Sequence, residues 1–364
     1  MPHPASSSSV RHEPLVVDRS GAERDDEGLL ARLLRDDATR VLAVRRDGAP
    51  VRDGRLVLVG VRDLVGTDAV RPANASGAVD TGSDAAGLSA STGSTHAASP
   101  DPARPASAGA ADDPVIDPTV ILPAAPSVGE WAFLGRDARG VAVVLAVLSD
   151  GAPESVVADA EWAPLRAVGG DLPEGEAELL TTAAALAGWL RDAAFCPACG
   201  ARTELRHAGW SRHCPVCGRE HFPRTDPAVI VLVRSATDDD RILLGANAAW
   251  GGSRYSCFAG FAEAGESLED AVRREVGEES GVRLHEIEYR GSQAWPYPRS
   301  LMLGFRARVV DDAEARPDGD EIVEVRWFDR DEVGAALRGE GAAQLPGAAS
   351  IAHRLIVDWY RGVA

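Results

Sequence analysis

The stretch GFAEAGESLEDAVRREVGEESGV, residues Gly260–Val282, decides the fold of the C-terminal half. Ser267 can cap the start of a helix here, and Asp270 follows three residues later, as in a capping box. Gly281 suits the left-handed turn that ends many helices. Between these ends, apolar residues recur at helical spacing and predict a buried stripe: Leu268, Ala271, Val272 and Val276.

Three glutamates lie close together near the end of this helix. Glu278 and Glu279 follow Glu275 by three and four residues, a spacing that places side chains on one side of a helix. Carboxylates so close repel one another unless a cation lies among them, and hard divalent cations such as Mg²⁺ prefer oxygen ligands. A merely solvated acidic helix would not explain why Arg274 and the more distant Glu266 accompany them. The segment therefore predicts a site for Mg²⁺ or Mn²⁺.

Four of the five cysteines form two pairs, Cys196-Pro-Ala-Cys199 and Cys214-Pro-Val-Cys217. Two C-x₂-C pairs at this separation predict a four-thiolate zinc site, and four protein ligands leave no open position for substrate. We therefore expect a structural zinc ion. His207 and His213 lie between the pairs and are alternative ligands, although surface positions are the simpler interpretation. The fifth cysteine, Cys257, is expected to be a small buried apolar residue.

Composition limits the classes of protein that this chain can be. The 364 residues carry a net charge of −18, which disfavours a dedicated nucleic-acid binder but does not exclude local basic patches. The sequence contains no uninterrupted apolar stretch of about 18 residues, the minimum for a membrane span. The N-terminus lacks the apolar core of a secretory signal. We expect no membrane association and a cytoplasmic location.

Changes in composition along the chain predict three domains and an α+β fold class. Residues 1–185 form an N-terminal α+β domain, with an Ala/Ser/Gly-rich insertion at about 71–113 that contains too few large apolar residues to build a core. Residues 186–222 form the zinc ribbon, and residues 223–364 form the catalytic domain. The expected elements are a hairpin at 131–148, a helix at 176–194, strands at 228–233, 241–246, 301–309 and 322–328, and a last helix at 350–360.

A second motif, Ser292-Gln293-Ala294-Trp295-Pro296-Tyr297-Pro298-Arg299-Ser300, follows the acidic helix. Two prolines and two aromatic residues within six positions indicate a stiff surface. Such a surface suits stacking on a purine or nicotinamide ring. The structural alternative is an ordinary proline-rich turn.

These motifs together resemble a known family. The acidic segment has the complete pattern G-x₅-E-x₇-R-E-U-x-E-E-x-G-U of Nudix hydrolases, where U is aliphatic. The second motif is similar to the SQPWPFPxS element of the NADH pyrophosphatases within that superfamily, with Ala294 in place of Pro and Tyr297 in place of Phe. The run FPRTDPAVI resembles the family's YPRxDPxxI, with Phe222 in place of Tyr, and SIAHRLI resembles its C-terminal element.

The resemblance implies a Nudix α/β/α sandwich preceded by a zinc ribbon and an N-terminal domain, and a homodimer. It implies that Glu275, Glu279, Glu321 and the Ala259 carbonyl ligate the catalytic metal. It also implies that Glu278 is a ligand or the base that activates water. Arg274 is expected to orient a glutamate, and Glu266 to brace the loop. The substrate-binding residues implied by the resemblance are Phe222, Gln293, Ala294, Trp295, Pro296, Tyr297, Pro298, Arg299, Ser300 and Ala352.

The expected activity is metal-dependent hydrolysis of the pyrophosphate bond of NADH or NAD⁺, giving AMP and nicotinamide mononucleotide. Two other substrates fit the same chemistry: the NAD cap at the 5′ end of RNA, and another nucleoside diphosphate such as ADP-ribose. A non-enzymatic nucleotide sensor is a further alternative, but such domains have lost glutamates that this sequence retains.

Overall fold

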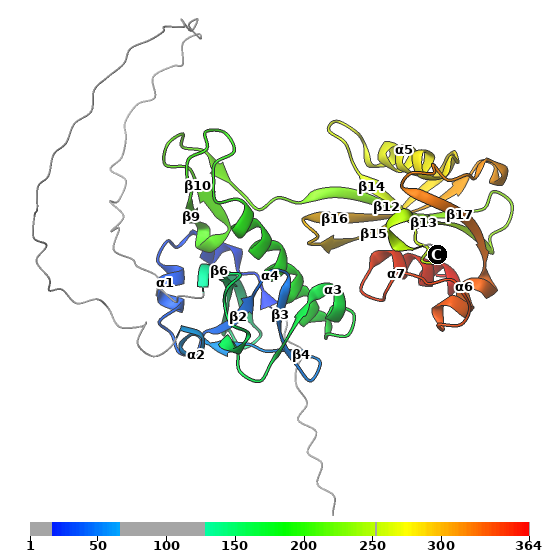
Figure 1. Ribbon diagram of the computed structural model, residues 1–364. Coiled ribbons are helices and arrows are strands. Elements are labelled where there is room, and N and C mark those ends of the chain that lie inside the picture. Colours follow the sequence, from blue (N-terminus) through cyan, green and yellow to red (C-terminus); the bar gives the residue numbers. More distant parts are fainter. Residues whose placement is uncertain (1–16, 66–127, 252, 364) are drawn as a thin grey trace, which may run out of the picture.

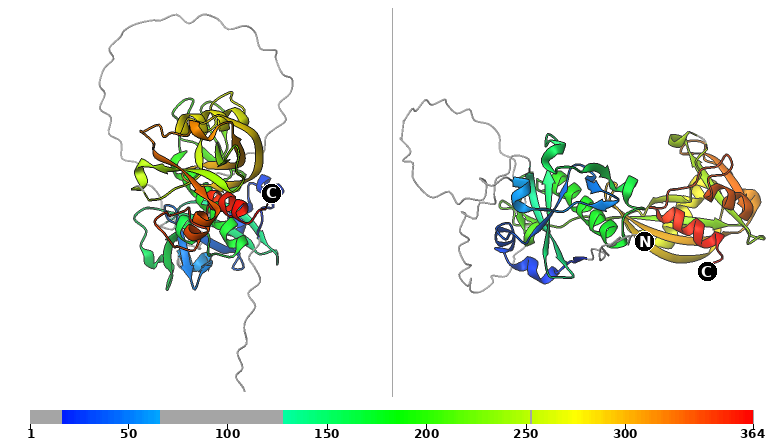
Figure 2. Two further views of the ribbon diagram at one scale, coloured as in Figure 1. Left: turned by 90° about the vertical axis from the view of Figure 1, so that its right-hand side faces the viewer. Right: turned by 90° about the horizontal axis from the view of Figure 1, so that it is seen from below.

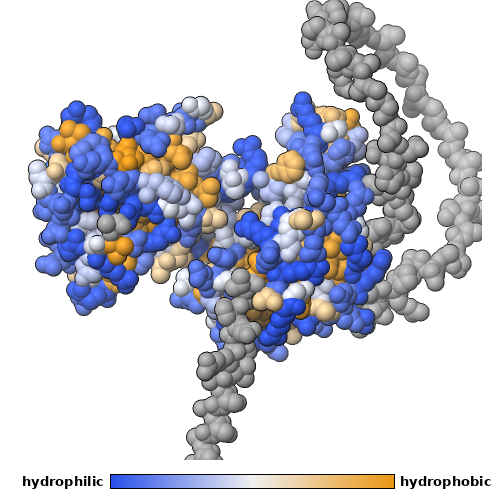
Figure 3. Space-filling model, turned by 180° about the vertical axis from the view of Figure 1, so that it is seen from behind, coloured by the Kyte–Doolittle hydropathy of each residue, from blue (hydrophilic) through white to orange (hydrophobic). Residues whose placement is uncertain are grey.

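The computed structural model describes residues 17–65, 128–251 and 253–363, which form two lobes joined by a narrow waist (Figures 1 and 3). The N-terminal lobe holds the first domain and the zinc ribbon, and the C-terminal lobe holds the acidic helix. The predicted insertion at 71–113 lies outside the described residues. Among the described residues, no helix is both long and apolar enough to span a bilayer.

The N-terminal domain contains two small sheets. The larger sheet has the strand order β1-β6-β7-β2-β5, and the smaller has the order β4-β3-β8. The expected hairpin is confirmed as an antiparallel pair of β6 and β7, in which every residue of β7 is buried. The strands are β1 Val17–Asp18, β2 Arg40–Val44, β3 Gly48–Arg52, β4 Arg55–Leu56, β5 Val59–Gly60, β6 Val128–Asp137, β7 Ala142–Leu148 and β8 Glu161–Pro164.

Helix α4, Glu174–Asp192, packs on this sheet through Leu179, Leu180, Leu186 and Leu190. These residues fall on one side because they recur at three- and four-residue intervals. The expected boundary between residues 185 and 186 falls within this helix. The shorter helices of the domain are α1 Leu29–Leu33, α2 Val61–Val65 and α3 Leu165–Val168.

The zinc ribbon contains a three-stranded antiparallel sheet with the order β11-β10-β9. Its strands are β9 Glu204–Arg206, β10 Ser211–His213 and β11 Glu220–His221. The buried Arg212 joins the ribbon to the first domain, because its guanidinium contacts Glu130 at 2.6 Å and the Leu190 carbonyl at 2.8 Å.

The C-terminal domain is built on a mixed sheet with the order β15-β16-β12-β13-β17, and β14 also pairs with β12. Helix α5 covers one face, and helices α6 and α7 cover the other (Figures 1 and 2). This arrangement confirms the expected α/β/α sandwich. The elements are β12 Asp226–Arg234, β13 Arg241–Asn247, β14 Phe258–Phe261, α5 Leu268–Ser280, β15 Leu284–Trp295, β16 Ser300–Val309, β17 Ile322–Asp329, α6 Arg330–Leu337 and α7 Ile351–Tyr360.

The ends of the acidic helix α5 are formed as the sequence predicts. The Ser267 hydroxyl accepts a hydrogen bond from the Asp270 N–H at 3.2 Å. Gly281 ends the helix with a φ of 69°, a conformation that glycine adopts without strain. Ala271, Val272 and Val276 are completely buried against the sheet.

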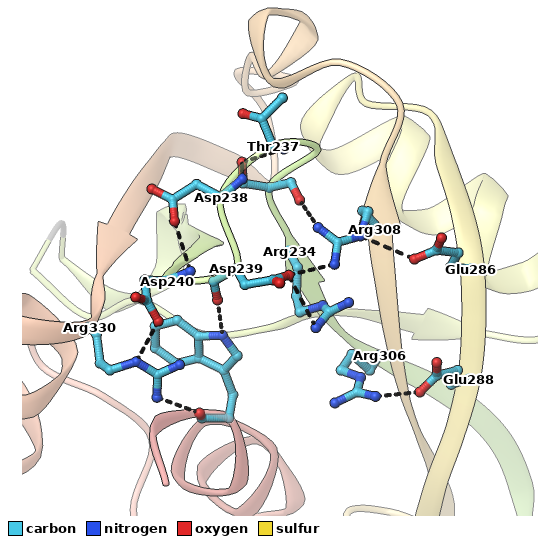
Figure 4. A network of polar contacts seen from close by, with 12 residues as sticks. Arg234, Thr237, Asp238, Asp239, Asp240, Glu286, Glu288, Arg306, Arg308 and Arg330 are labelled. Atoms are coloured by element: carbon cyan, nitrogen blue, oxygen red, sulfur yellow. Dashed lines mark hydrogen bonds and ion pairs between the residues drawn. The ribbon is translucent and has the colours of Figure 1, made fainter. Parts of the chain in front are cut away.

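Ionic contacts link neighbouring strands at one end of this sheet (Figure 4). Arg308 contacts Asp239 at 2.5 Å and Glu286 at 3.1 Å, and Arg306 contacts Glu288 at 2.6 Å. Burial lowers the pKa of Arg234, and the positive charges of Arg308 and Arg306 beside it lower this pKa further. Three arginines face three carboxylates here, so the charges offset one another.

Candidate active site and zinc site

The four cysteine sulfurs converge in the ribbon. All four Sγ atoms lie within 4.8 Å of one another, with Cys199 and Cys214 at 3.5 Å and Cys196 and Cys217 at 3.6 Å. Tetrahedral zinc with bonds of about 2.3 Å needs sulfurs about 3.8 Å apart. The four thiols therefore fit a structural zinc ion, as the spacing predicts.

Backbone amides of the ribbon favour the thiolate form that zinc needs. The N–H groups of Cys217 and Val216 lower the pKa of Cys214 to about 6. His221 lies with its Nε2 atom 3.3 Å from the Cys196 sulfur, a contact that the cysteine spacing did not reveal. His207 instead contacts Asp25 at 3.0 Å, and neither His207 nor His213 belongs to the sulfur cluster.

Glu279 is the most deeply buried carboxylate of the acidic helix. Its side chain faces β14, where it accepts a hydrogen bond from the Ala259 N–H at 3.2 Å. Burial raises the pKa of Glu279 to about 8, and the nearby charges of Glu321, Glu275 and Asp318 add to the effect. Among the described residues it has no cationic partner. A buried carboxylate surrounded by other carboxylates is the arrangement that a bound cation would relieve.

Glu275 lies against the backbone of β14 at Gly260. A Cβ atom at position 260 would lie 2.0–2.1 Å from the Glu275 carboxyl group, so only glycine leaves room for it. Partial burial raises the pKa of Glu275, although Arg274 opposes this shift. The first glycine of the acidic motif is therefore explained by the approach of this carboxylate.

Arg274 connects the loop before the helix to the carboxylates on it. Its guanidinium donates to both carboxylate oxygens of Glu266 at 2.8 Å and to the Phe261 carbonyl at 2.9 Å. It also contacts Glu275 at 2.9 Å and Glu278 at 3.2 Å. The hydrogen bonds from Arg274 lower the pKa of Glu266 to about 2. These contacts agree with the bracing role expected for Glu266.

The helix does not direct all three glutamates in the same way. Glu279 is buried, Glu275 is half-buried, and the Glu278 side chain is 61% exposed. Consecutive residues of a helix are rotated by about 100° about its axis, so the side chains of Glu278 and Glu279 point in different directions. Glu278 therefore has more access to water than either of the other two glutamates.

Glu321 comes from a distant part of the chain, just before β17. The Asn247 side-chain amide donates to it at 3.3 Å, and its backbone carbonyl accepts from the Ala248 N–H at 2.8 Å. The charge of Asp318 also raises the pKa of Glu279, a contribution that the sequence did not reveal. Among the described residues only the cysteines bring three ligand atoms within 4.8 Å, so these carboxylates lie further apart than the thiols do.

Because Glu279 is buried, metal binding to it should change the thermal stability of the protein, and this change can be measured. Its pKa is about 8 in the folded protein and near 4.5 when unfolded, so between these values the folded state holds a proton that the unfolded state has lost. Its contribution to the free energy of unfolding therefore falls as pH rises from 4.5 to 8. We expect Mg²⁺ to raise the Tm more at pH 8 than at pH 6, because the ion replaces this proton.

Glu279→Gln is expected to remove both the pH-dependent term and most of the Mg²⁺ effect on Tm. Glu340→Gln, an exposed substitution in the same domain, is the control. Thermal unfolding with and without Mg²⁺ measures both quantities. An equal Mg²⁺ effect on the wild type and Glu279→Gln would contradict the assignment of Glu279 as a ligand.

The proline-rich motif is in contact with the N-terminal domain. The Tyr297 hydroxyl accepts a hydrogen bond from the Arg166 N–H at 2.9 Å, and the Arg166 guanidinium lies 4.5 Å from the ring centroid. Trp295 packs edge-on against Tyr297, with centroids 5.2 Å apart. Because Arg166 covers one face of Tyr297, a substrate base can stack only on the rest of this aromatic pair.

Two other expected substrate residues have structural contacts. Gln293 donates to the Ala349 carbonyl at 2.7 Å and accepts from the Ile351 N–H at 2.6 Å, which fixes the start of α7. Ala352, on α7, is buried in the hydrophobic core. The positions of the other expected substrate residues vary: Phe222, Ala294 and Pro298 are exposed, Pro296 is half-buried, Arg299 pairs with Asp226, and Ser300 is buried. Their roles toward substrate stay predictions.

The ring of Tyr297 is expected to matter more than its hydroxyl. Tyr297→Phe removes one hydrogen bond at a partly solvated site, a loss of about 1 kcal/mol. Tyr297→Ala removes one of the two rings of the aromatic pair. It is expected to raise KM for NADH roughly tenfold, with a smaller change in kcat. Steady-state kinetics and Tm are to be measured on both variants. A lower Tm with unchanged KM in Tyr297→Ala would show that the ring serves only the domain contact.

Comparisons with known proteins agree with this arrangement over most of the described chain, up to residue 346. Residues 12–189 match the NADH pyrophosphatase-like rudimentary NUDIX domain, residues 191–222 the NADH pyrophosphatase zinc ribbon domain, and residues 224–346 the NUDIX domain. The NAD-capped RNA hydrolase NudC of Mycobacterium tuberculosis is 43% identical over 239 residues, which cover 63% of this chain and 75% of the relative. The chain belongs to the NADH pyrophosphatase family of Nudix hydrolases.

A second relative of the same name supports the assignment to the NADH pyrophosphatase family. NudC of Chromobacterium violaceum is 40% identical over 196 residues, which cover 54% of this chain and 69% of that protein. The family model also shows that the N-terminal domain is a rudimentary NUDIX domain, which the sequence pattern predicted only as an α+β domain.

Proposed function

We propose that this enzyme hydrolyses the pyrophosphate bond of NADH or NAD⁺, giving AMP and nicotinamide mononucleotide. The observation that carries the proposal is the complete acidic site of a NADH pyrophosphatase family member. Buried Glu279 lies beside Glu275 and Glu321 with no cationic partner among the described residues. A protein that only sensed nucleotides would not need this set of carboxylates.

Mg²⁺ or Mn²⁺ is the cofactor that these oxygen ligands would hold. Glu275, Glu279, Glu321 and the Ala259 carbonyl are the proposed ligands. When bound, the metal neutralises the charge of the pyrophosphate and acidifies water. The zinc ion of the ribbon has a structural role, because its four thiolates fill the coordination sphere.

The side chains divide the remaining tasks. Exposed Glu278 is the proposed base that takes a proton from the attacking water. Arg274 holds Glu278 and Glu275 in place, and its strong pairing with Glu266 fixes the loop that carries Gly260. Water attacks phosphorus directly, so no covalent enzyme intermediate forms.

Recognition of the dinucleotide is assigned to aromatic residues near the waist. Trp295 and Tyr297 form one surface for a base, and exposed Phe222 lies on the segment that joins the ribbon to β12. We infer that the enzyme is a cytoplasmic homodimer and that a second subunit completes the substrate pocket. Size measurement in solution tests the homodimer.

A second candidate activity is removal of the NAD cap from the 5′ end of RNA. The relatives named as NAD-capped RNA hydrolases favour it. The bond that breaks would be the same, so the residues above would act in the same way. The two substrates differ only in whether an RNA chain is attached to the adenosine.

Comparison of kcat/KM for NADH, NAD-capped RNA and ADP-ribose tests this assignment, with either Mg²⁺ or Mn²⁺ present. We expect both NAD-containing substrates to be cleaved better than ADP-ribose, which lacks the nicotinamide ring. A preference for ADP-ribose would contradict the assignment of the aromatic residues to nicotinamide-containing substrates.

A further inference from the structure

A hollow in the N-terminal domain lies outside the acidic site. It has a volume of about 270 Å³ and opens between the β2–β3 turn and β8. Its lining combines arginines, one indole ring and two carboxylates. The residues are Arg45, Arg46, Asp47, Gly48, Asp150, Trp162 and Pro164.

Trp162 gives this hollow an aromatic wall that is held in place. The Arg45 guanidinium lies 5.2 Å from the centre of the Trp162 ring, and the indole N–H donates to the Glu154 carbonyl at 3.0 Å. Arg45 is itself fixed by Glu154 at 2.7 Å. Arg45 covers part of the ring, so a base can stack only on the part of the indole that Arg45 leaves free, and a half-buried indole fixed in this way loses little side-chain entropy on stacking.

Two exposed arginines accompany the hollow: Arg46 lines it, and Arg191 contacts the backbone of Arg46. Arg46 has only a surface contact with Asp150 at 3.5 Å, in which both side chains are more than 70% exposed. Such ion pairs contribute little and exchange readily with other anions. Arg191 donates to the Arg46 carbonyl at 2.7 Å and has no carboxylate partner among the described residues.

The arginines at the end of the C-terminal sheet differ from these. Arg306 and Arg308 are each held by carboxylates at 2.5–3.1 Å and are mostly buried (Figure 4). An incoming phosphate would have to displace those carboxylates. Arg46 would give up only its 3.5 Å surface contact with Asp150, and Arg191 has no carboxylate to displace among the described residues.

The hollow is connected to the proposed substrate-binding motif. Asp47, which lines it, pairs with Arg166 at 3.0 Å, and Arg166 stacks on Tyr297. Arg166 therefore links the hollow to the aromatic pair of Trp295 and Tyr297. A substrate that extends beyond the dinucleotide could reach both places.

We propose that this hollow binds a nucleotide of the RNA that is joined to an NAD cap, with its base on Trp162 and its phosphates at Arg46 and Arg191. Stacking on an aromatic ring next to cationic side chains is how proteins hold single-stranded nucleic acid without strong sequence preference. The small volume admits one base but not a duplex. The inference rests on the proposed hydrolysis of the NAD pyrophosphate bond.

Steady-state kinetics on two substrates test the proposal. Trp162→Ala is expected to raise KM for a short NAD-capped single-stranded RNA roughly tenfold and to leave KM for NADH unchanged. Trp162→Phe should restore most of the RNA affinity. Arg46→Ala and Arg191→Ala should each reduce by about one the slope of log KM for the RNA against log salt concentration. Arg62→Ala, an exposed substitution in the same domain, is the control.

Equal effects of Trp162→Ala on both substrates, or no effect on either, would overturn the proposal. So would wild-type enzyme that cleaves NADH but not the capped RNA. If Trp162→Ala changes only the inhibition of NADH cleavage by AMP, the hollow binds a free mononucleotide. That result would also overturn the proposal. If the wild type fails on NADH as well, the proposed function is wrong. Binding of an uncapped single-stranded RNA to wild type and Trp162→Ala then still tests the hollow.

Discussion

Glu278→Gln is expected to lower kcat about 10²–10⁴-fold, the range typical for loss of a general base. Gln keeps the shape of the side chain but cannot take a proton from water. Because the Glu278 side chain is 61% exposed, its replacement should not change the fold. Rates of NADH cleavage at saturating Mg²⁺ measure the effect.

Glu269→Gln is the matched control for Glu278→Gln, since it changes an exposed glutamate at the start of the same helix. This control should retain wild-type turnover. Tm and zinc content should be unchanged in both variants. Near-normal kcat in Glu278→Gln would contradict the role of Glu278 as the base.

Gly260→Ala is expected to lower kcat/KM by at least about 10²-fold, although it adds only one methyl group. The new Cβ would overlap the Glu275 carboxyl group, at 2.0–2.1 Å, and would push this proposed ligand away from the site. Displacement of a catalytic group by about 1 Å can have an effect of that size. Kinetics at several Mg²⁺ concentrations should show weaker activation by the metal.

Gly277→Ala provides the control for Gly260→Ala. A Cβ at position 277 would come no closer than 3.9 Å to the Val282 carbonyl, and alanine favours helix over glycine. We expect Gly277→Ala to keep full activity and to be slightly more stable. If Gly260→Ala is activated by Mg²⁺ as well as the wild type is, the present position of Glu275 is not required for metal binding.

The catalytic helix and the ribbon could be predicted from the sequence because their signals are local. Ser267 and Gly281 specify the ends of one helix, and the four cysteines lie within 22 residues, Cys196–Cys217. The glutamate spacing placed Glu275 and Glu279 near each other. The unequal burial of Glu278 and Glu279 depends on the position of β14, which the helix sequence does not contain.

Contacts between distant segments could not be predicted in this way. Arg166 and Tyr297 are 131 positions apart and meet only because the two lobes join at the waist. The same is true of Asn247 and Glu321, which are 74 positions apart. Gln293 was expected to face substrate, yet both groups of its amide are used to fix the start of α7. Motif spacing does not encode which partner a polar side chain meets.

Identification of the products formed from NADH tests the central claim most directly. The enzyme is incubated with NADH and either Mg²⁺ or Mn²⁺, and the products are separated by chromatography. Hydrolysis at the pyrophosphate predicts equal amounts of AMP and reduced nicotinamide mononucleotide, and neither product without a divalent cation. Absence of AMP with both metals, from folded protein that contains zinc, would contradict the account.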